Sequence, residues 1–233
     1  MYNRILLKLS GEALGSEKGV FDVDVMSALG AQIREIVEEG CQVGIVVGGG
    51  NLVRGKAFAK IGLDRVASDH IGMLGTTLNA MVLAAALEMN GVKAQVMSAT
   101  VVDGVEPIDV PKAKRLLADK HVVIFGGGVG EPYFSTDTGS ALRASEIGAE
   151  VIFMAKNGVD GVYDDDPDKN PNAKRFDVLS FDDILKLNLK VIDATAASMC
   201  KDNGIDAFVF KMSEEGNIVK AVRGTAVGTV IKA

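Results

Sequence analysis

The chain has 233 residues, of which 48% are hydrophobic and 24% charged, a composition typical of one sizeable domain with a buried core. Its formal net charge of −6 argues against a general binder of nucleic acid or of anionic membranes, but a local site can still bind a small anion. Two cysteines, Cys41 and Cys200, have neither disulfide-framework nor metal-ligand spacing, which indicates a reduced, cytoplasmic compartment. The first residues are too interrupted by charge for a signal peptide. The apolar stretch 80–89 is about half a membrane span, so no membrane partner is expected.

Short apolar runs alternate with amphipathic stretches along the chain. Runs rich in β-branched residues predict buried strands at residues 4–10, 42–48, 93–99, 121–127, 150–156, 206–212 and 228–233. Helical patterns lie between them at about 23–39, 64–90, 111–119, 137–148, 180–188, 193–203 and 214–222. This alternation predicts an α/β fold, a three-layer αβα sandwich around a mostly parallel sheet, in a single domain over residues 1–233. Turn residues cluster at 157–177, and an irregular segment of that length is usually functional.

Glycine-rich turns follow several of the predicted strands, where ligands of open α/β sheets bind. The segments after the first, second, fourth and fifth strands read KLSGEALG, GGGNLVRGKA, GGGVGEPYFSTDT and KNGVDGVYDDDP. Glycine lets backbone N–H groups approach an anion, and the nearby Lys8, Arg54 and Lys56 add positive charge. We therefore expect a polyanionic ligand such as a phosphate ester. The alternative is that these glycines serve only tight packing of the turns.

The segment GNLVRGKA, residues 50–57, is close to a P-loop but ends in Ala57, where a P-loop has the hydroxyl that binds Mg²⁺. A P-loop enzyme also has an acidic residue at the end of another strand, and only the weak run LKVID supplies one, Asp193. A P-loop is therefore not expected. A dinucleotide fold is a weaker alternative, because the glycine spacing G-x-G-x-x-G fails after the first strand.

Lys8 and Ser10 alternate with Leu7 and Leu9, so both polar side chains should point to one face at the end of the first strand. Gly11 then frees the backbone for a tight turn. A lysine ammonium beside such a turn can neutralise the oxygens of a phosphoryl group in transfer. A solvent-facing lysine at a strand end is the alternative interpretation.

Five motifs, in this order, cover nearly the whole chain: KLSGEAL, VVGGGNLVRG, DHIGMLGT, GGGVGEPYFSTDTGSALRASEIGA and KNGVDGVYDDDP. Together they resemble the bacterial uridylate kinases, which have the amino-acid-kinase fold rather than the P-loop fold. The combination of DHIGMLGT with GEPYFSTDT is specific to that branch. The resemblance implies transfer of a phosphoryl group from ATP to UMP, giving ADP and UDP. It also implies that the match of GNLVRGKA to a P-loop is chance and that Lys56 is not the phosphate lysine.

The resemblance assigns roles to individual residues. It implies catalytic roles for Lys8, Arg54 and Asp137, where Asp137 could instead be the N-cap of the next helix. The implied ATP-binding residues are Lys8, Leu9, Ser10, Gly11, Gly50, Arg54, Asn157, Tyr163 and Asp166. The implied UMP-binding residues are Gly49, Asp69, Val129, Gly130, Glu131, Pro132, Tyr133, Phe134, Ser135 and Thr136. The chain departs from the family at Asn157 and Gly158, where Thr-Lys is common.

The implied cofactor is Mg²⁺, held mainly by the phosphates of ATP as co-substrate, with no protein metal site. No general base is needed, since the phosphate of UMP is already ionised. The family is usually hexameric, so the apolar helix face Met73, Leu74, Leu78, Met81, Val82 and Ala85 is expected to be core and also a subunit interface. GTP or UTP is implied as an effector, although the variable segment 13–22 adjoins the regulatory region. A kinase of the same fold acting on a carboxylate or carbamate, and a nucleotide-sensing module, remain as alternatives.

Overall fold

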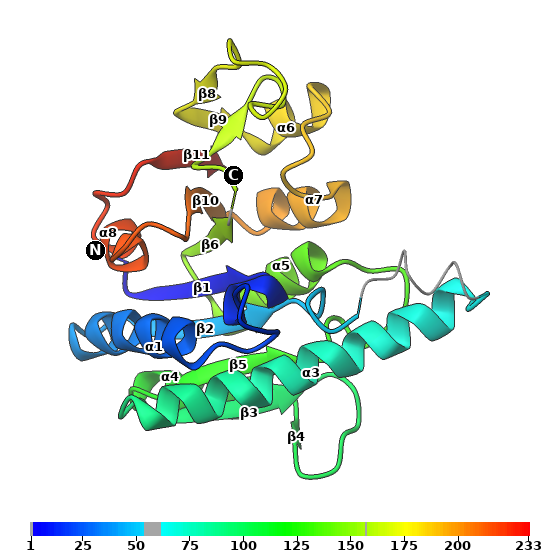
Figure 1. Ribbon diagram of the computed structural model, residues 1–233, viewed down its shortest axis with the longest axis vertical. Coiled ribbons are helices and arrows are strands. Elements are labelled where there is room, and N and C mark those ends of the chain that lie inside the picture. Colours follow the sequence, from blue (N-terminus) through cyan, green and yellow to red (C-terminus); the bar gives the residue numbers. More distant parts are fainter. Residues whose placement is uncertain (1, 54–61, 157) are drawn as a thin grey trace.

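The computed structural model describes residues 2–53, 62–156 and 158–233 (Figure 1). The strands are β1 Arg4–Leu9, β2 Gln42–Val47, β3 Ala94–Ser98, β4 Glu106–Pro107, β5 Val122–Gly126, β6 Val151–Lys156, β7 Val162–Tyr163, β8 Arg175–Phe176, β9 Val178–Ser180, β10 Asp206–Lys211 and β11 Gly228–Lys232. The helices are η1 Gly11–Leu14, α1 Val23–Glu38, α3 Arg65–Met89, α4 Val110–Ala118, α5 Thr136–Ile147, α6 Phe181–Lys186, α7 Ala194–Asp202 and α8 Asn217–Val222.

A central sheet runs through the described part of the chain in the order β4-β3-β5-β2-β1-β6-β10-β11-β9. Its neighbouring strands are parallel except for β10 and β11, which pair antiparallel. The prediction of a mostly parallel sheet is therefore confirmed. Each of the seven predicted strands is present, with its ends within one residue of the predicted ends.

Side-chain alternation along the strands divides the core between two faces of the sheet. On one face, Ile5 and Leu7 of β1 pack with α1, α3 and α8. On the other, Leu6 of β1 packs with α4, α5, α6 and α7. The predicted αβα sandwich is confirmed, and Figure 1 shows α1 and α3 lying across one face of the sheet.

The segment predicted to be irregular, 157–177, holds the short antiparallel pair β7–β8, so that prediction is wrong in part. The strands β4, β7, β8 and β9 were not predicted either. Each has two or three residues, too few to display a period-2 pattern.

Helix α3 is unusual for its length and apolar character. Among the described residues it alone is long and apolar enough to cross a membrane, with a mean hydropathy of 1.4 over its most apolar window. However, 56% of that window is buried inside the fold, as in the core helix of a globular protein.

Candidate active site

Strand β1 lies at the position where the strand order of the sheet changes direction. Its neighbours are β2 on one side and β6 on the other, so the chain winds away from β1 both ways. A crevice forms at the carboxyl ends of the strands at such a switch point. Lys8, near the carboxyl end of β1, lies there with its side chain on the α5 side of the sheet, as its alternation with Leu7 and Leu9 predicts.

Lys8 forms an ion pair with Asp137. Lys8 Nζ lies 2.5 Å from Asp137 Oδ1, and the two side chains are only 14% and 18% exposed. The alternative that Asp137 caps helix α5 is wrong, because Ser135 is the N-cap and its hydroxyl accepts a hydrogen bond from the Thr138 N–H at 3.1 Å. Asp137 lies in the first turn of α5, where the helix dipole favours a carboxylate, and its side chain is thus free to hold Lys8.

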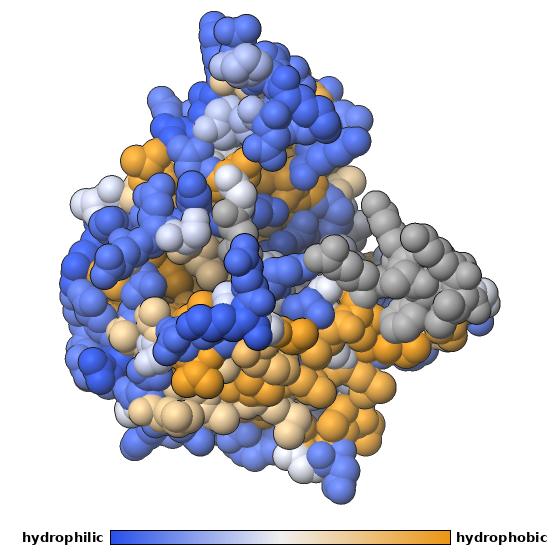
Figure 2. Space-filling model, in the orientation of Figure 1, coloured by the Kyte–Doolittle hydropathy of each residue, from blue (hydrophilic) through white to orange (hydrophobic). Residues whose placement is uncertain are grey.

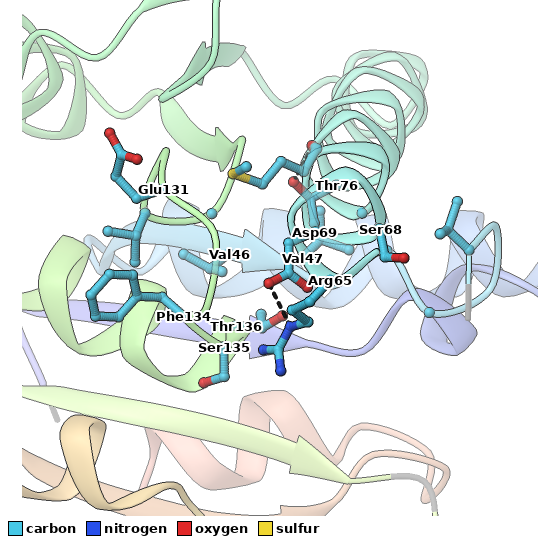
Figure 3. Close-up of a pocket in the computed structure, with 17 residues that line it drawn as sticks. Val46, Val47, Arg65, Ser68, Asp69, Thr76, Glu131, Phe134, Ser135 and Thr136 are labelled. Carbon is cyan, nitrogen blue, oxygen red and sulfur yellow. Dashed lines mark hydrogen bonds and ion pairs between the residues drawn. The ribbon is translucent and has the colours of Figure 1, made fainter. Parts of the chain in front are cut away.

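A cavity of about 370 Å³ opens on the β2 side of β1, between α3, the end of β2 and the loop before α5 (Figure 3). Seven of the residues predicted to bind UMP line it: Gly49, Asp69, Val129, Glu131, Phe134, Ser135 and Thr136. Gly130, Pro132 and Tyr133 lie in the same loop but are not part of the lining. Gly50, predicted on the ATP side, lines this cavity as well.

Asp69 is held by two groups at the mouth of this cavity. Its Oδ2 atom accepts hydrogen bonds from the Tyr133 backbone N–H at 2.8 Å and from Arg65 Nε at 2.7 Å. Burial acts to raise the pKa of Asp69, but these hydrogen bonds and the Arg65 charge outweigh it and hold the pKa below its usual value. The Arg65 guanidinium also lies over the Tyr133 ring, 5.3 Å from its centroid. In Figure 3, Arg65 and Asp69 of α3 face the segment that carries Ser135 and Thr136.

Polar side chains buried in α3 fix the glycine turns at the base of the cavity. The Thr76 hydroxyl accepts a hydrogen bond from the Gly127 N–H at 2.8 Å, and Gly127 has φ +75°. Asn79, fully buried, donates to the Gly48 carbonyl and to Asn51 Oδ1, both at 2.7 Å. No role was predicted for Thr76 or Asn79. The sequence signal for both is a polar side chain within an otherwise apolar helix.

A second cavity, of about 580 Å³, opens on the other side of β1, at the ends of β6 and β10. Tyr163 and Asp166, both predicted to bind ATP, line it. The Tyr163 hydroxyl donates to Asp160 Oδ1 at 2.6 Å, and Asp160 in turn pairs with Arg175 at 2.7 Å. The ring is therefore held in place by the β7–β8 pair, in the segment where the sequence showed only turns.

The sequence and the fold of this chain match those of known kinases. The sequence profile of the Amino acid kinase family matches residues 3–211. The chain belongs to the amino acid kinase family. A uridylate kinase of Streptococcus thermophilus is 49% identical over 99% of this chain and 95% of its own length. The crystal structures of UMP kinases from Ureaplasma parvum and Bacillus anthracis each superpose with a TM-score of 0.95 at 36% identity, covering 100% and 99% of this chain and 100% and 96% of theirs.

Several predicted residues of this amino acid kinase contribute through the backbone or lie elsewhere. Leu9 is fully buried in the core, and its carbonyl accepts a hydrogen bond from the Gly48 N–H at 2.9 Å. Ser10 and Gly11 form the turn into η1. Arg54 and Asn157, together with Lys56 and Ala57, lie outside the described residues.

Two further residues near the site, Asp193 and Lys156, were not predicted to bind a ligand. Asp193 is not the end of a strand but the N-cap of α7, and its carboxylate accepts from the Thr138 hydroxyl at 3.1 Å. It therefore joins α7 to the first turn of α5. Lys156, at the end of β6, lines the second cavity. In sequence it is one strand-end lysine among many, so only the three-dimensional arrangement distinguishes it.

Proposed function

We propose that this chain is a UMP kinase, which transfers the γ-phosphoryl group of ATP to UMP and gives UDP and ADP in pyrimidine nucleotide biosynthesis. The observation that carries the proposal is the placement of two cavities on opposite sides of β1, with the Lys8–Asp137 pair at the strand between them. Two substrates bound there would meet end to end at Lys8. Residues 1–233 would form one amino-acid-kinase-like domain for this reaction.

The first cavity is the proposed UMP site. Both hydrogen bonds that Asp69 accepts use Oδ2, so Oδ1 can accept one from a ribose hydroxyl. The segment 129–136 would enclose the nucleotide, and Gly49 would contact its phosphate. We assign the whole loop to UMP binding, including the residues outside the cavity lining: Val129, Gly130, Glu131, Pro132, Tyr133, Phe134, Ser135 and Thr136.

The second cavity is the proposed site of the ATP nucleoside, bounded by Tyr163 and Asp166. The phosphate chain of ATP would then run toward the turn after β1. Backbone N–H groups of that turn are suited to bind phosphate oxygens. The remaining residues assigned to ATP are Leu9, Ser10, Gly11, Gly50, Arg54 and Asn157.

Catalysis by this site is electrostatic. The UMP phosphate is ionised at neutral pH, so it attacks the γ-phosphorus without a general base. The bond between the γ-phosphorus and the oxygen that bridges it to the β-phosphorus breaks as the new P–O bond forms, and that oxygen leaves with ADP. Charge is spread over the equatorial oxygens of the transferring group. The Lys8 ammonium neutralises part of that charge, and Asp137 holds Lys8 in position for it. Arg54 would add a second cation from the glycine turn.

Bound with ATP, Mg²⁺ would supply positive charge that neutralises part of the charge of the phosphates. The described residues contain no cluster of three or more His, Cys, Asp or Glu side chains that could hold a metal ion. This donor set fits an ion held mostly by phosphate and water, the usual state of Mg²⁺ in kinases. Asp137 is the carboxylate at the transfer point, and it could contribute one oxygen.

A homohexamer is the proposed assembly. Helix α3 presents exposed apolar side chains, Leu74, Leu78 and Met81, which are 54%, 46% and 45% exposed. Figure 2 shows orange side chains gathered over α3 in this view. Contact with a second copy would cover them.

Regulation by GTP or UTP is also proposed, on the family resemblance. A place in the cytoplasm is proposed on the acidic, cysteine-poor composition.

The proposal is tested by ADP release from ATP·Mg²⁺ with one acceptor at a time: UMP, CMP, dTMP, GMP, aspartate, N-acetylglutamate or carbamate. We expect turnover with UMP. Turnover with a carboxylate or carbamate instead would leave the fold intact and reject the acceptor assignment. ATP binding without any turnover would favour a nucleotide-sensing module.

Replacing Lys8 separates a kinase from a sensor. We expect Lys8→Ala to lower kcat with UMP by about 10²–10³-fold, because a preorganised cation at the phosphoryl group is lost. Circular dichroism should show an unchanged fold. The control is Lys18→Ala, a lysine that is 72% exposed and forms an ion pair with Asp24 outside both cavities. A Lys8→Ala enzyme with near-normal kcat would contradict the assigned role.

A further inference from the structure

Lys156 shares a face of the sheet with Lys8. Strands β1 and β6 pair in parallel, with Lys8 opposite Met154, so Lys156 lies two residues further along the neighbouring strand. Met154 packs in the core on the α5 side of the sheet, and residues two apart on a strand point the same way. The side chains of Lys8 and Lys156 therefore lie on the same side, at adjacent strand ends.

The surroundings of Lys156 leave its charge largely uncompensated. Its Nζ atom donates to the Val191 carbonyl at 3.3 Å, and within residues 2–53, 62–156 and 158–233 it forms no ion pair. Asp137, the carboxylate that acts on both lysines, is paired with Lys8. Burial and the charge of Lys8 lower the pKa of Lys156 to about 8, against the opposing effect of Asp137. Two lysines thus lie near one carboxylate. An additional anion would compensate the positive charge that remains on the two ammonium groups.

Lys156 also belongs to the second cavity, which Tyr163 and Asp166 line. It therefore connects the proposed nucleoside site of ATP with the Lys8–Asp137 pair. A phosphate chain that runs from that cavity to Lys8 must pass the end of β6. Lys156 is not needed as an ion-pair partner of Asp137, because Asp137 already pairs with Lys8. It is not needed as a general base either, because the acceptor phosphate is already ionised.

We propose that the Lys156 ammonium binds the β- and γ-phosphates of ATP from the nucleoside side, next to Lys8, as a further cation for phosphoryl transfer. This inference rests on the proposed function, since it takes the ligand of the second cavity to be ATP. The ammonium keeps its proton throughout. As the oxygen of the UMP phosphate bonds to the γ-phosphorus, the bridging oxygen leaves with ADP, and Lys156 stays bound to the departing charge.

The experiment compares Lys156→Met, Lys156→Arg and the control Lys232→Met. Methionine keeps an unbranched apolar stem without the charge. Lys232 is a strand-end lysine paired with Asp206, the first residue of β10, and so lies at the opposite end of the strands from Lys156. Calorimetric titration would measure the affinity of each variant for ATP and for adenosine. Steady-state rates with UMP would give kcat/KM for ATP and KM for UMP.

We expect Lys156→Met to weaken ATP binding at least about tenfold while leaving adenosine binding unchanged. It should lower kcat/KM for ATP by about 10²-fold, the usual loss of one preorganised partner of transferring charge, and leave KM for UMP within about threefold. Lys156→Arg should recover most of the loss in ATP binding, and Lys232→Met should match the wild type.

The inference is overturned if Lys156→Met binds ATP as the wild type does, or if it loses ATP and adenosine equally, as a structural defect in the cavity would cause. Should Lys156→Met fail to fold, Lys156→Gln is measured in its place against the same two ligands. The binding comparison needs no acceptor. A wild-type protein that does not phosphorylate UMP would therefore reject the proposed function while still testing Lys156.

Discussion

At the scale of single residues, the unusual feature is that two lysines lie near one carboxylate in a partly buried position. Lys8 has a direct partner in Asp137, whereas Lys156 has a carbonyl at 3.3 Å. Lys156 is therefore charged at some cost to folding, as its lowered pKa indicates. Such a cost is typical of sites shaped for a ligand rather than for stability.

The cost should appear in the pH dependence of stability. The pKa of Lys156 is about 8 in the folded protein, below the ordinary value of 10.5, so the unfolded chain binds more protons between these values. The penalty is fully present below pH 8 and is lost as the pH rises toward 10.5. We expect Lys156→Met to exceed the wild type in free energy of unfolding by about 1–3 kcal/mol at pH 7, with the difference shrinking by pH 10.

Urea denaturation at pH 7, 8, 9 and 10 would measure this difference. The groups that set the pKa are Lys8 on β1 and Asp137 on α5, while Lys211 is the register neighbour of Lys156 on β10. Because the variant and the wild type share every other titrating group, the contributions of groups distant from Lys156 cancel in the difference. A difference that stays constant from pH 7 to pH 10 would contradict the lowered pKa.

At the scale of elements, the turn after β5 is held between α3 and the end of β3. A Cβ atom at Gly127 would lie 2.7 Å from the Thr100 backbone nitrogen and 2.8 Å from that of Ala99. Its N–H is bound to Thr76, so the turn cannot move away without breaking that hydrogen bond. The start of the proposed UMP loop is thereby fixed to the sheet.

Gly127→Ala is expected to lower the free energy of unfolding by more than about 2 kcal/mol, since it adds a backbone clash to the cost of a left-handed residue. The matched control is Gly91→Ala, where φ is +77°, close to the +75° of Gly127, but no atom lies within 4 Å of the new Cβ. That variant should lose only about 1–2 kcal/mol. Chemical denaturation of both variants measures the difference, and equal losses would show that crowding at Gly127 is unimportant.

The length of an element decides whether its pattern can be recognised in the sequence. The long strands and helices were predictable because each repeats its pattern over enough residues to be recognised. The face of the sheet to which the Lys8 side chain points was predictable, because Lys8 alternates with the buried Leu7 and Leu9. The ion pair to Asp137 was not, because the cap that frees Asp137 is Ser135, and a sequence cannot say which of two neighbouring polar residues begins the helix. Lys156 depends on strand register, which no local pattern encodes.

At the scale of the whole molecule, the order of strands accounts for the arrangement of the site. Because β1 lies between β2 and β6, the elements on its two sides build two separate cavities, and the end of β1 lies between them. The two cavities draw on separate segments. The end of β2, the turn after it, α3 and the loop before α5 line one, and Lys156, residues between 159 and 169, residues 187–191 and Val209 line the other. Each nucleotide site can therefore vary in sequence without displacing Lys8.

In the described part of the single chain, one face of α3 exposes apolar side chains. Leu74, Leu78 and Met81 follow the spacing i, i+4, i+7 and so form one stripe along the helix. An exposed stripe of this kind commonly marks a protein–protein interface. We expect Leu78→Glu to place a charge in that interface and to dissociate the proposed hexamer, at a cost of several kcal/mol per buried unpaired charge.

Sedimentation velocity would measure the assembly of 24.4-kDa chains directly. The wild type should sediment as six chains, and Leu78→Glu as a smaller species with an unchanged circular dichroism spectrum. The control is Val178→Glu, which introduces the same charge at a residue that is 61% exposed on β9, at the far end of the sheet from β3 and β4. If Leu78→Glu sediments as the wild type does, the α3 stripe is not the interface. Dissociation by Val178→Glu as well would mean that added charge, rather than its position on α3, disrupts the assembly.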